Sequence, residues 1–189
     1  MIIACLGWGS LVWNRDGLPI SSAWRSDGPT IPVEFARQSD NGRITLVITD
    51  AAPEVAVLWA TLAAGDIEKA KAELALREGI SSRNISLSIG YWTRAAASRG
   101  PEAEAIGRWA ETLGHDGVVW TALRPRFAKE YRTPSQTEVV AYLANLTGEQ
   151  RVEAERYCRR APAQIRTPYR TLIESRLGWV HEPGTSPDP

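Results

Sequence analysis

Apolar and polar positions in the first part of the chain predict a series of strands. Residues 2–6 form an unbroken apolar run, as expected for a strand that is buried on both faces. Residues 30–37 and 43–49 flank an Asp-Asn-Gly turn, so together they predict a hairpin. A fourth strand is expected over residues 55–61.

The pattern then changes to helical spacing. Residues 66–78 place apolar side chains three and four positions apart, which predicts a helix that stops at Gly79. Further along, residues 84–91 and 117–122 are expected to form strands. Residues 101–114, which begin with a proline, are expected to form a short helix between them.

The last third of the chain predicts helices. One helix is expected from residue 134 onward, a second over residues 148–160, and a third over residues 169–177, which stops at a glycine. Strands first and helices later indicate an α+β domain, which we place at residues 1–180. Residues 181–189 are rich in proline, and we expect them to form a flexible tail.

Charge and composition narrow the classes of function. The 189 residues include 22 Lys and Arg and 22 Asp and Glu, so the formal net charge is zero. A dedicated nucleic-acid binder or a polybasic membrane binder needs a positive field, which argues against both. No apolar run approaches the roughly 18 residues that span a bilayer, and no secretory signal is visible. We therefore expect a cytoplasmic protein, a monomer or homodimer, with neither nucleic acid nor membrane as a partner.

Eight tryptophans are many for this length, and most should belong to the core or to pocket walls. Three of them, Trp92, Trp109 and Trp179, leave two interpretations open. They either form an exposed apolar patch for self-association or belong to an ordinary core.

Cysteine and histidine are too few and too scattered to predict a metal site. The chain has two cysteines, Cys5 and Cys158, and two histidines, His115 and His181. A Cys and His site would need nearly all of them at once, so we predict no metal site. Cys5 lies in an apolar strand, which disfavours a thiolate nucleophile. Cys158 lies in a charged run that is typical of a solvated helix face, where nearby arginines would make an exposed thiol reactive.

The first predicted strand runs directly into the sequence Leu-Gly-Trp-Gly-Ser-Leu-Val-Trp at residues 6–13. Glycines leave room for a ligand beside the backbone, and the free N–H groups of such a turn bind anions such as a carboxylate. The alternative interpretation is a tight turn between two core strands, and spacing alone favours this alternative.

A second and a third segment change that balance. In order, the chain carries Gly-Trp-Gly-Ser-Leu-Val-Trp at 7–13, Gly-Arg-Ile-Thr-Leu-Val at 42–47, and Leu-Arg-Glu at 76–78 before a predicted strand. This order resembles the γ-glutamylcyclotransferase-like superfamily, most closely its ChaC-type branch, over about residues 2–125. The resemblance implies a small, mostly closed mixed β-barrel surrounded by helices, to which the helical last third is added.

The resemblance also implies an activity and a site. The implied reaction is intramolecular aminolysis of a γ-glutamyl amide or peptide, which releases 5-oxoproline without a cofactor. Glu78 would be the general acid and base, and the turn formed by Trp8, Gly9, Ser10 and Leu11 would hold the α-carboxylate of the substrate. Relatives usually carry tyrosine where this chain has Trp8, so a contact made by that hydroxyl is not transferred. The residues alone favour a solvated helix-end side chain for Glu78, and the resemblance reverses that preference.

Other charged residues complete the hypothesis. Arg37 and Arg43 lie on predicted strands and either reach a substrate carboxylate or face solvent. Arg77 is expected to pair with Glu73 on the helix surface, and Arg83 is the neighbour that a solvated Glu78 would contact. The leading hypothesis is a γ-glutamyl cyclotransferase that acts on a small-molecule γ-glutamyl substrate. The alternative is a non-catalytic small-molecule binding or interaction module on the same fold.

Overall fold

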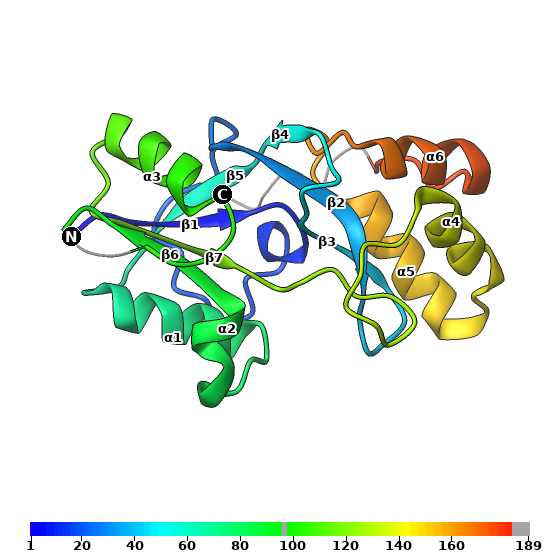
Figure 1. The fold of residues 1–189 in the computed structure, drawn as a ribbon, viewed down its shortest axis with the longest axis horizontal. Helices are drawn as coiled ribbons and strands as arrows, with labels where there is room; N and C mark the ends of the chain where they lie inside the picture. The colour runs from blue at the N-terminus through cyan, green and yellow to red at the C-terminus, as the bar shows by residue number, and fades with distance from the viewer. Residues whose placement is uncertain (96–97, 183–189) are drawn as a thin grey trace.

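The structure, a computed structural model, describes residues 1–95 and 98–182. Its strands fall into two sheets, one of four strands and one of three (Figure 1). The larger sheet has the order β5-β1-β7-β6, and β1 runs antiparallel to β5 but parallel to β7. Its strands are β1 (Ile3–Gly7), β5 (Leu58–Leu62), β6 (Ile89–Thr93) and β7 (Gly117–Thr121).

The smaller sheet has the order β3-β2-β4 and contains the predicted hairpin. Its strands are β2 (Thr30–Gln38), β3 (Ile44–Ile48) and β4 (Glu54–Ala56). β2 and β3 pair antiparallel from Val33 opposite Ile48 to Gln38 opposite Ile44, with a bulge between Phe35 and Arg37. The hairpin prediction is therefore confirmed.

The single strand expected over residues 55–61 is wrong, because this run divides between the two sheets. β4 pairs with β2, while β5, which starts two residues later, pairs with β1. Between them, the N–H of Val57 donates to the carbonyl of Pro29. The run therefore links the two sheets, and among the described residues no ladder closes them into the barrel that the resemblance implies.

Helices cover both faces of the four-stranded sheet (Figure 1). Helix α1 (Ile67–Arg77) packs with Cys5 and Val119, whereas helix α3 (Ala103–Thr112) packs on the opposite face with Leu6 and Trp120. This separation follows from strand alternation, which sends successive side chains of β1 and β7 to opposite faces. The core beneath α3 continues without interruption to the hairpin and to the helices of the last third.

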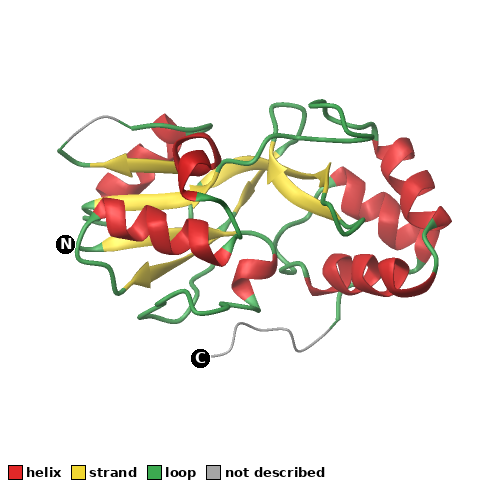
Figure 2. Cartoon of the chain, turned by 90° about the horizontal axis from the view of Figure 1, so that it is seen from below, coloured by secondary structure: helices red, strands yellow, loops and turns green. Residues whose placement is uncertain are grey.

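The last third is helical, as predicted. It contains α4 (Gln136–Asn145), α5 (Gly148–Arg160) and α6 (Pro168–Leu177), which gather at one end of the molecule (Figure 2). Side-chain caps set two of their starts: Ser135 forms a capping box with Glu138, and Thr167 accepts from the N–H of Arg170. The chain is thus α+β, with two sheets and a helical end.

The strand expected over residues 84–91 is only half correct. Residues Ser82–Asn84 form a 3-10 turn (η2) and Ile85–Ser88 a single turn of helix (α2) before β6 begins. The Asn-Ile-Ser-Leu-Ser-Ile pattern alternates as a strand would, but Leu87 is 67% exposed and has no sheet to face. Alternation alone therefore does not decide between a strand and a short helical turn.

The end of the described chain lies against α5. The ring Nδ1 of His181 is 3.0 Å from the carbonyl of Arg159, to which the N–H of Glu182 also donates. The rest of the tail predicted over 181–189 lies outside the described residues. Within the described ranges, every helix is too short or too polar to cross a bilayer.

Candidate functional site

The end of α1 places the predicted acidic residue. Glu78 is the C-cap of this helix, and its N–H donates to the carbonyl of Leu74. Gly79 follows with φ +66°, a left-handed conformation that ends the helix and that glycine adopts at little cost. The side chain of Glu78 is 18% exposed. The interpretation of Glu78 as a solvated helix-end residue beside Arg83 therefore fails, because Glu78 is mostly buried and pairs with Arg77.

Arg77 joins this helix end to the glycine-containing turn. One guanidinium nitrogen donates to the Glu78 carboxylate, and the other lies 2.6 Å from the carbonyl oxygen of Asn14 and 3.3 Å from the hydroxyl of Ser10. The predicted pair of Arg77 with Glu73 is wrong, since Glu73 pairs with Lys69 instead. Arg77 turns inward because its partners are the turn and Glu78, which lie on the buried side of the helix.

The turn itself consists of the short 3-10 helix η1 (Ser10–Val12), which begins directly after β1. The N–H of Val12 donates to the carbonyl of Gly9, which leaves the N–H groups of Ser10 and Leu11 without a partner inside this helical turn. Donors of this kind are available to a bound anion.

The two glycines are required by neighbouring aromatic rings. A Cβ at Gly7 would lie 2.7 Å from the ring of Trp24, and a Cβ at Gly9 would clash with the hydroxyl of Tyr157. Neither glycine has a positive φ. The expectation that these two glycines leave room for a ligand beside the backbone is therefore wrong, because side chains of the protein take that room.

Strand β3 holds the two aromatic side chains of the site. The indole N–H of Trp8 donates to the carbonyl of Leu46 at 3.1 Å, and the N–H of Leu46 donates to the hydroxyl of Tyr157 at 3.1 Å. Burial raises the pKa of the Tyr157 hydroxyl, so this group stays protonated at neutral pH. The indole N–H of Trp8 thus has its hydrogen-bond partner within the protein, the carbonyl of Leu46.

These groups surround an inner cavity of about 250 Å³. It is bounded by the turn, by the hairpin and by the end of β7, and Glu78 lies in its wall. The predicted site residues that line it are Trp8, Gly9, Ser10, Leu11, Arg37 and Glu78. The fold thus brings all six together from three separate parts of the chain.

Arg37 supplies a positive charge to the inner cavity. Its guanidinium donates to the carbonyl of Arg124 at 2.8 Å, which fixes the side chain against the segment after β7. Burial, and then the neighbouring charge of Arg126, lower its pKa from the ordinary value of 12.5. Arg37 is half-buried and lines the inner cavity, and its contact with a substrate carboxylate stays a prediction.

A polar pocket of about 600 Å³ adjoins the inner cavity. The two hollows share four wall residues, Ser10, Arg43, Glu78 and Tyr157. The Arg43 guanidinium lies 5.6 Å from the Tyr157 ring centroid, in a cation–π arrangement. Glu78 therefore lines both the inner cavity and the larger polar pocket.

Tyr157 is the wall residue that the sequence interpretation missed. It lies in the charged run that was expected to face solvent, but both Tyr157 and Cys158 are buried. Burial raises the pKa of the Cys158 thiol to about 12, so the prediction of an exposed, reactive thiol is wrong. The signal was present, because Ala154, Tyr157, Cys158 and Ala161 form an apolar stripe at helical spacing.

The remaining candidates belong to the core. Cys5 is fully buried, and burial raises the pKa of its thiol. Trp92 and Trp179 are buried and Trp109 packs against the same core, so the core interpretation holds for these three. His115 is buried between Trp59 and Trp109.

The inner cavity therefore combines two carboxylates, Glu78 and Asp40, two guanidinium groups, Arg37 and Arg43, backbone donors and two aromatic walls. Such a set can bind a small molecule with a carboxylate and can exchange a proton with it. Within residues 1–95 and 98–182, no group of three or more His, Cys, Asp or Glu side chains is arranged to hold a metal ion. Comparison with protein-family models and with curated proteins finds no match.

Proposed function

We propose that the chain is a γ-glutamyl cyclotransferase, in which Glu78 moves the proton and the inner cavity holds the glutamyl group. One observation carries this proposal: the carboxylate of Glu78, the Ser10 turn and Arg37 line one cavity of about 250 Å³. A glutamyl group, with one carboxylate, one amine and a short apolar stem, suits a space of that size and polarity.

The turn supplies the anchor. The N–H groups of Ser10 and Leu11, together with the Ser10 hydroxyl, would donate hydrogen bonds to the α-carboxylate of the substrate. Arg77, which contacts both Ser10 and Glu78, keeps the anchor and the carboxylate in a fixed relation. Arg77 acts through these two residues and is a positioning residue.

The reaction balances without water or a cofactor. The α-amine nitrogen of the substrate attacks its own γ-carbonyl carbon, and the new C–N bond closes the five-membered ring. The bond from that carbon to the leaving nitrogen then breaks. Glu78 takes a proton from the attacking amine and delivers it to the leaving nitrogen, which departs as a neutral amine. Confinement favours the bent conformation that the ring closure needs.

The test is release of 5-oxoproline from a panel of γ-glutamyl compounds: glutathione, γ-glutamyl dipeptides and γ-glutamyl amines. We expect wild type to form product and Glu78→Gln to be slower by about 10²–10⁴-fold, the range for loss of a general acid–base group. The thermal midpoint should stay close to that of wild type, since Gln retains the size and hydrogen-bonding capacity of Glu.

Glu68→Gln is the matched control. It removes a carboxylate from the first turn of the same helix, where the side chain is 76% exposed, and should leave turnover unchanged. Equal turnover by wild type and Glu78→Gln would refute the role of Glu78. Saturable binding of a γ-glutamyl compound without product would replace the enzyme with the small-molecule binding module.

A further inference from the structure

A third hollow, distinct from the inner cavity and the polar pocket, lies on the other side of the segment that follows β7. This outer groove has a volume of about 690 Å³. The segment alternates between the two spaces: Thr121 lines the inner cavity, Ala122 and Arg124 line the outer groove, and Leu123 lines both. The groove is thus separate from the inner cavity and shares one wall with it.

One part of the groove is apolar and exposed. Leu87 and Tyr131 line it with 67% and 74% of their surfaces accessible, and Ile89, Pro101 and Pro125 continue the wall. Single exposed apolar side chains are ordinary on a protein surface, but here several from distant parts of the chain meet around one hollow. A ligand with an apolar body would bury this surface.

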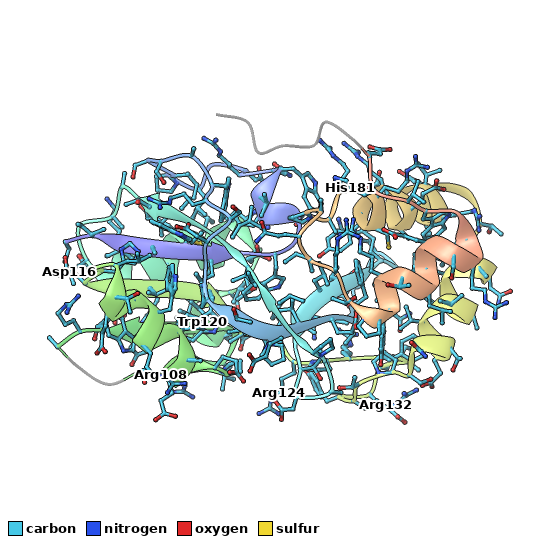
Figure 3. All side chains as sticks on the ribbon, turned by 90° about the horizontal axis from the view of Figure 1, so that it is seen from above. Arg108, Asp116, Trp120, Arg124, Arg132 and His181 are labelled. Carbon is cyan, nitrogen blue, oxygen red and sulfur yellow. The ribbon has the colours of Figure 1, made fainter. Side chains whose placement is uncertain are left out.

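The charged side chains of the groove are mainly positive. They are three arginines, Arg99, Arg124 and Arg132, and one aspartate, Asp50. Figure 3 places Arg124 and Arg132 along the same side of the molecule. Arg132 is held by Glu138 at 2.7 Å, and this ion pair keeps its charge balanced.

Arg99 and Arg124 differ from Arg132 in this respect. Within the described part of the chain, neither guanidinium forms an ion pair with a carboxylate, and both residues are exposed. The backbone carbonyl of Arg124 is already engaged, because it accepts from Arg37. This hydrogen bond fixes the backbone of Arg124, while its guanidinium remains available to an anion at the rim of the outer groove.

We propose that the outer groove is a second binding site, which takes an amphipathic organic anion: a carboxylate on an aryl or alkyl body. The carboxylate would pair with Arg99 and Arg124, and the body would cover Leu87 and Tyr131. This inference rests on the groove alone and is independent of the proposed function.

The test is calorimetric titration of the full chain with 4-phenylbutyrate and with octanoate. We expect saturable binding of one molecule per chain by at least one of them. Butyrate lacks the apolar body and 4-phenylbutanol lacks the charge, so each should bind at least about tenfold more weakly, the effect of losing one of two comparable contributions. Arg99→Gln and Arg124→Gln should each weaken binding about fivefold, the upper range for an exposed ion pair.

Two further variants locate the binding. Leu87→Ser alters a residue of the outer groove that does not line the inner cavity, and it should weaken binding of 4-phenylbutyrate. Arg108→Gln removes an arginine from α3 whose side chain is 69% exposed and should have no effect. Absence of saturable binding by both probes would overturn the proposal. So would an equal loss in Arg108→Gln, or unchanged binding in Leu87→Ser and both groove arginine variants.

Discussion

Arg170 and Arg77 have almost equally buried side chains but differ in how many of their N–H groups have partners. Arg170, in α6, is saturated: it donates to three backbone carbonyls and to Glu174. Arg77, in α1, donates to Glu78 and to the turn, but its Nε has no hydrogen-bond partner among the described residues. Arg170 therefore links α6 to the segment that precedes it, whereas Arg77 lines the polar pocket. The comparison shows that one buried arginine is fully satisfied within the fold, whereas the other keeps this unpartnered N–H at the wall of the polar pocket.

The largest expected effect is on stability and tests the hydrogen bonds of Arg170. Arg170→Met keeps most of the side-chain volume but removes the guanidinium donor from the carbonyls of Ala161, Pro162 and Ile165, of which only Pro162 keeps a second donor, the N–H of Ile165, among the hydrogen bonds of the described residues. We expect the free energy of unfolding to fall by about 3–5 kcal/mol, as when one partner of a buried charged network is removed. Urea denaturation measures this loss. Arg176→Met on the exposed face of the same helix should change it by less than about 0.5 kcal/mol. A comparable loss in both variants would refute the role of Arg170.

A smaller loss of stability is expected when Arg77 is replaced. Arg77→Met removes the partner of Glu78, but water that enters the adjoining cavity can solvate the carboxylate that remains. We therefore expect a loss of about 1–2 kcal/mol in the same denaturation measurement, below the range for a fully buried pair. A loss as large as that of Arg170→Met would mean that Arg77 and Arg170 contribute equally to stability, and would contradict the difference between them.

The smallest effect concerns pH and the carboxyl that caps α6. Glu34 is buried and accepts from the Thr167 hydroxyl at 2.5 Å and from the N–H of Phe35 at 2.8 Å. Burial nevertheless raises its pKa above the ordinary value of 4.5. The native state therefore holds a proton that the unfolded state has lost, and stability should fall as pH rises from 4.5 through the raised pKa.

The measurement is the free energy of unfolding of wild type and Glu34→Gln from about pH 4 to 8, around the ordinary carboxyl value. The difference between the two proteins isolates Glu34, since all other groups titrate in both. Glu138, whose pKa in the native state is lowered to about 2 chiefly by its hydrogen bond with Arg132, is present in both proteins, so its effect cancels in the difference. A difference that stays constant, or that favours wild type as pH rises, would contradict the raised pKa.

Much of the secondary structure was predictable because its signals are local. The apolar run at 2–6, the hairpin, the helix that ends at Gly79 and the helices at 148–160 and 169–177 all follow from spacing, turns and caps within a few residues. The errors fall where local signals are ambiguous. Nothing within residues 54–62 says that the run pairs with two different sheets, because pairing is decided by the strands on either side.

The sequence, with the resemblance that its motifs carry, singled out six residues that line the inner cavity, through the glycine-containing turn, the Arg-Glu pair at the end of a helix, and Arg37 on a strand. Tertiary structure decided how they meet. Tyr157 comes from a helix more than 140 residues after the turn and occupies the space that Gly9 leaves open. The outer groove likewise arises only where distant segments come together. Local patterns specify elements, whereas a cavity exists only between elements, so its walls are determined by packing.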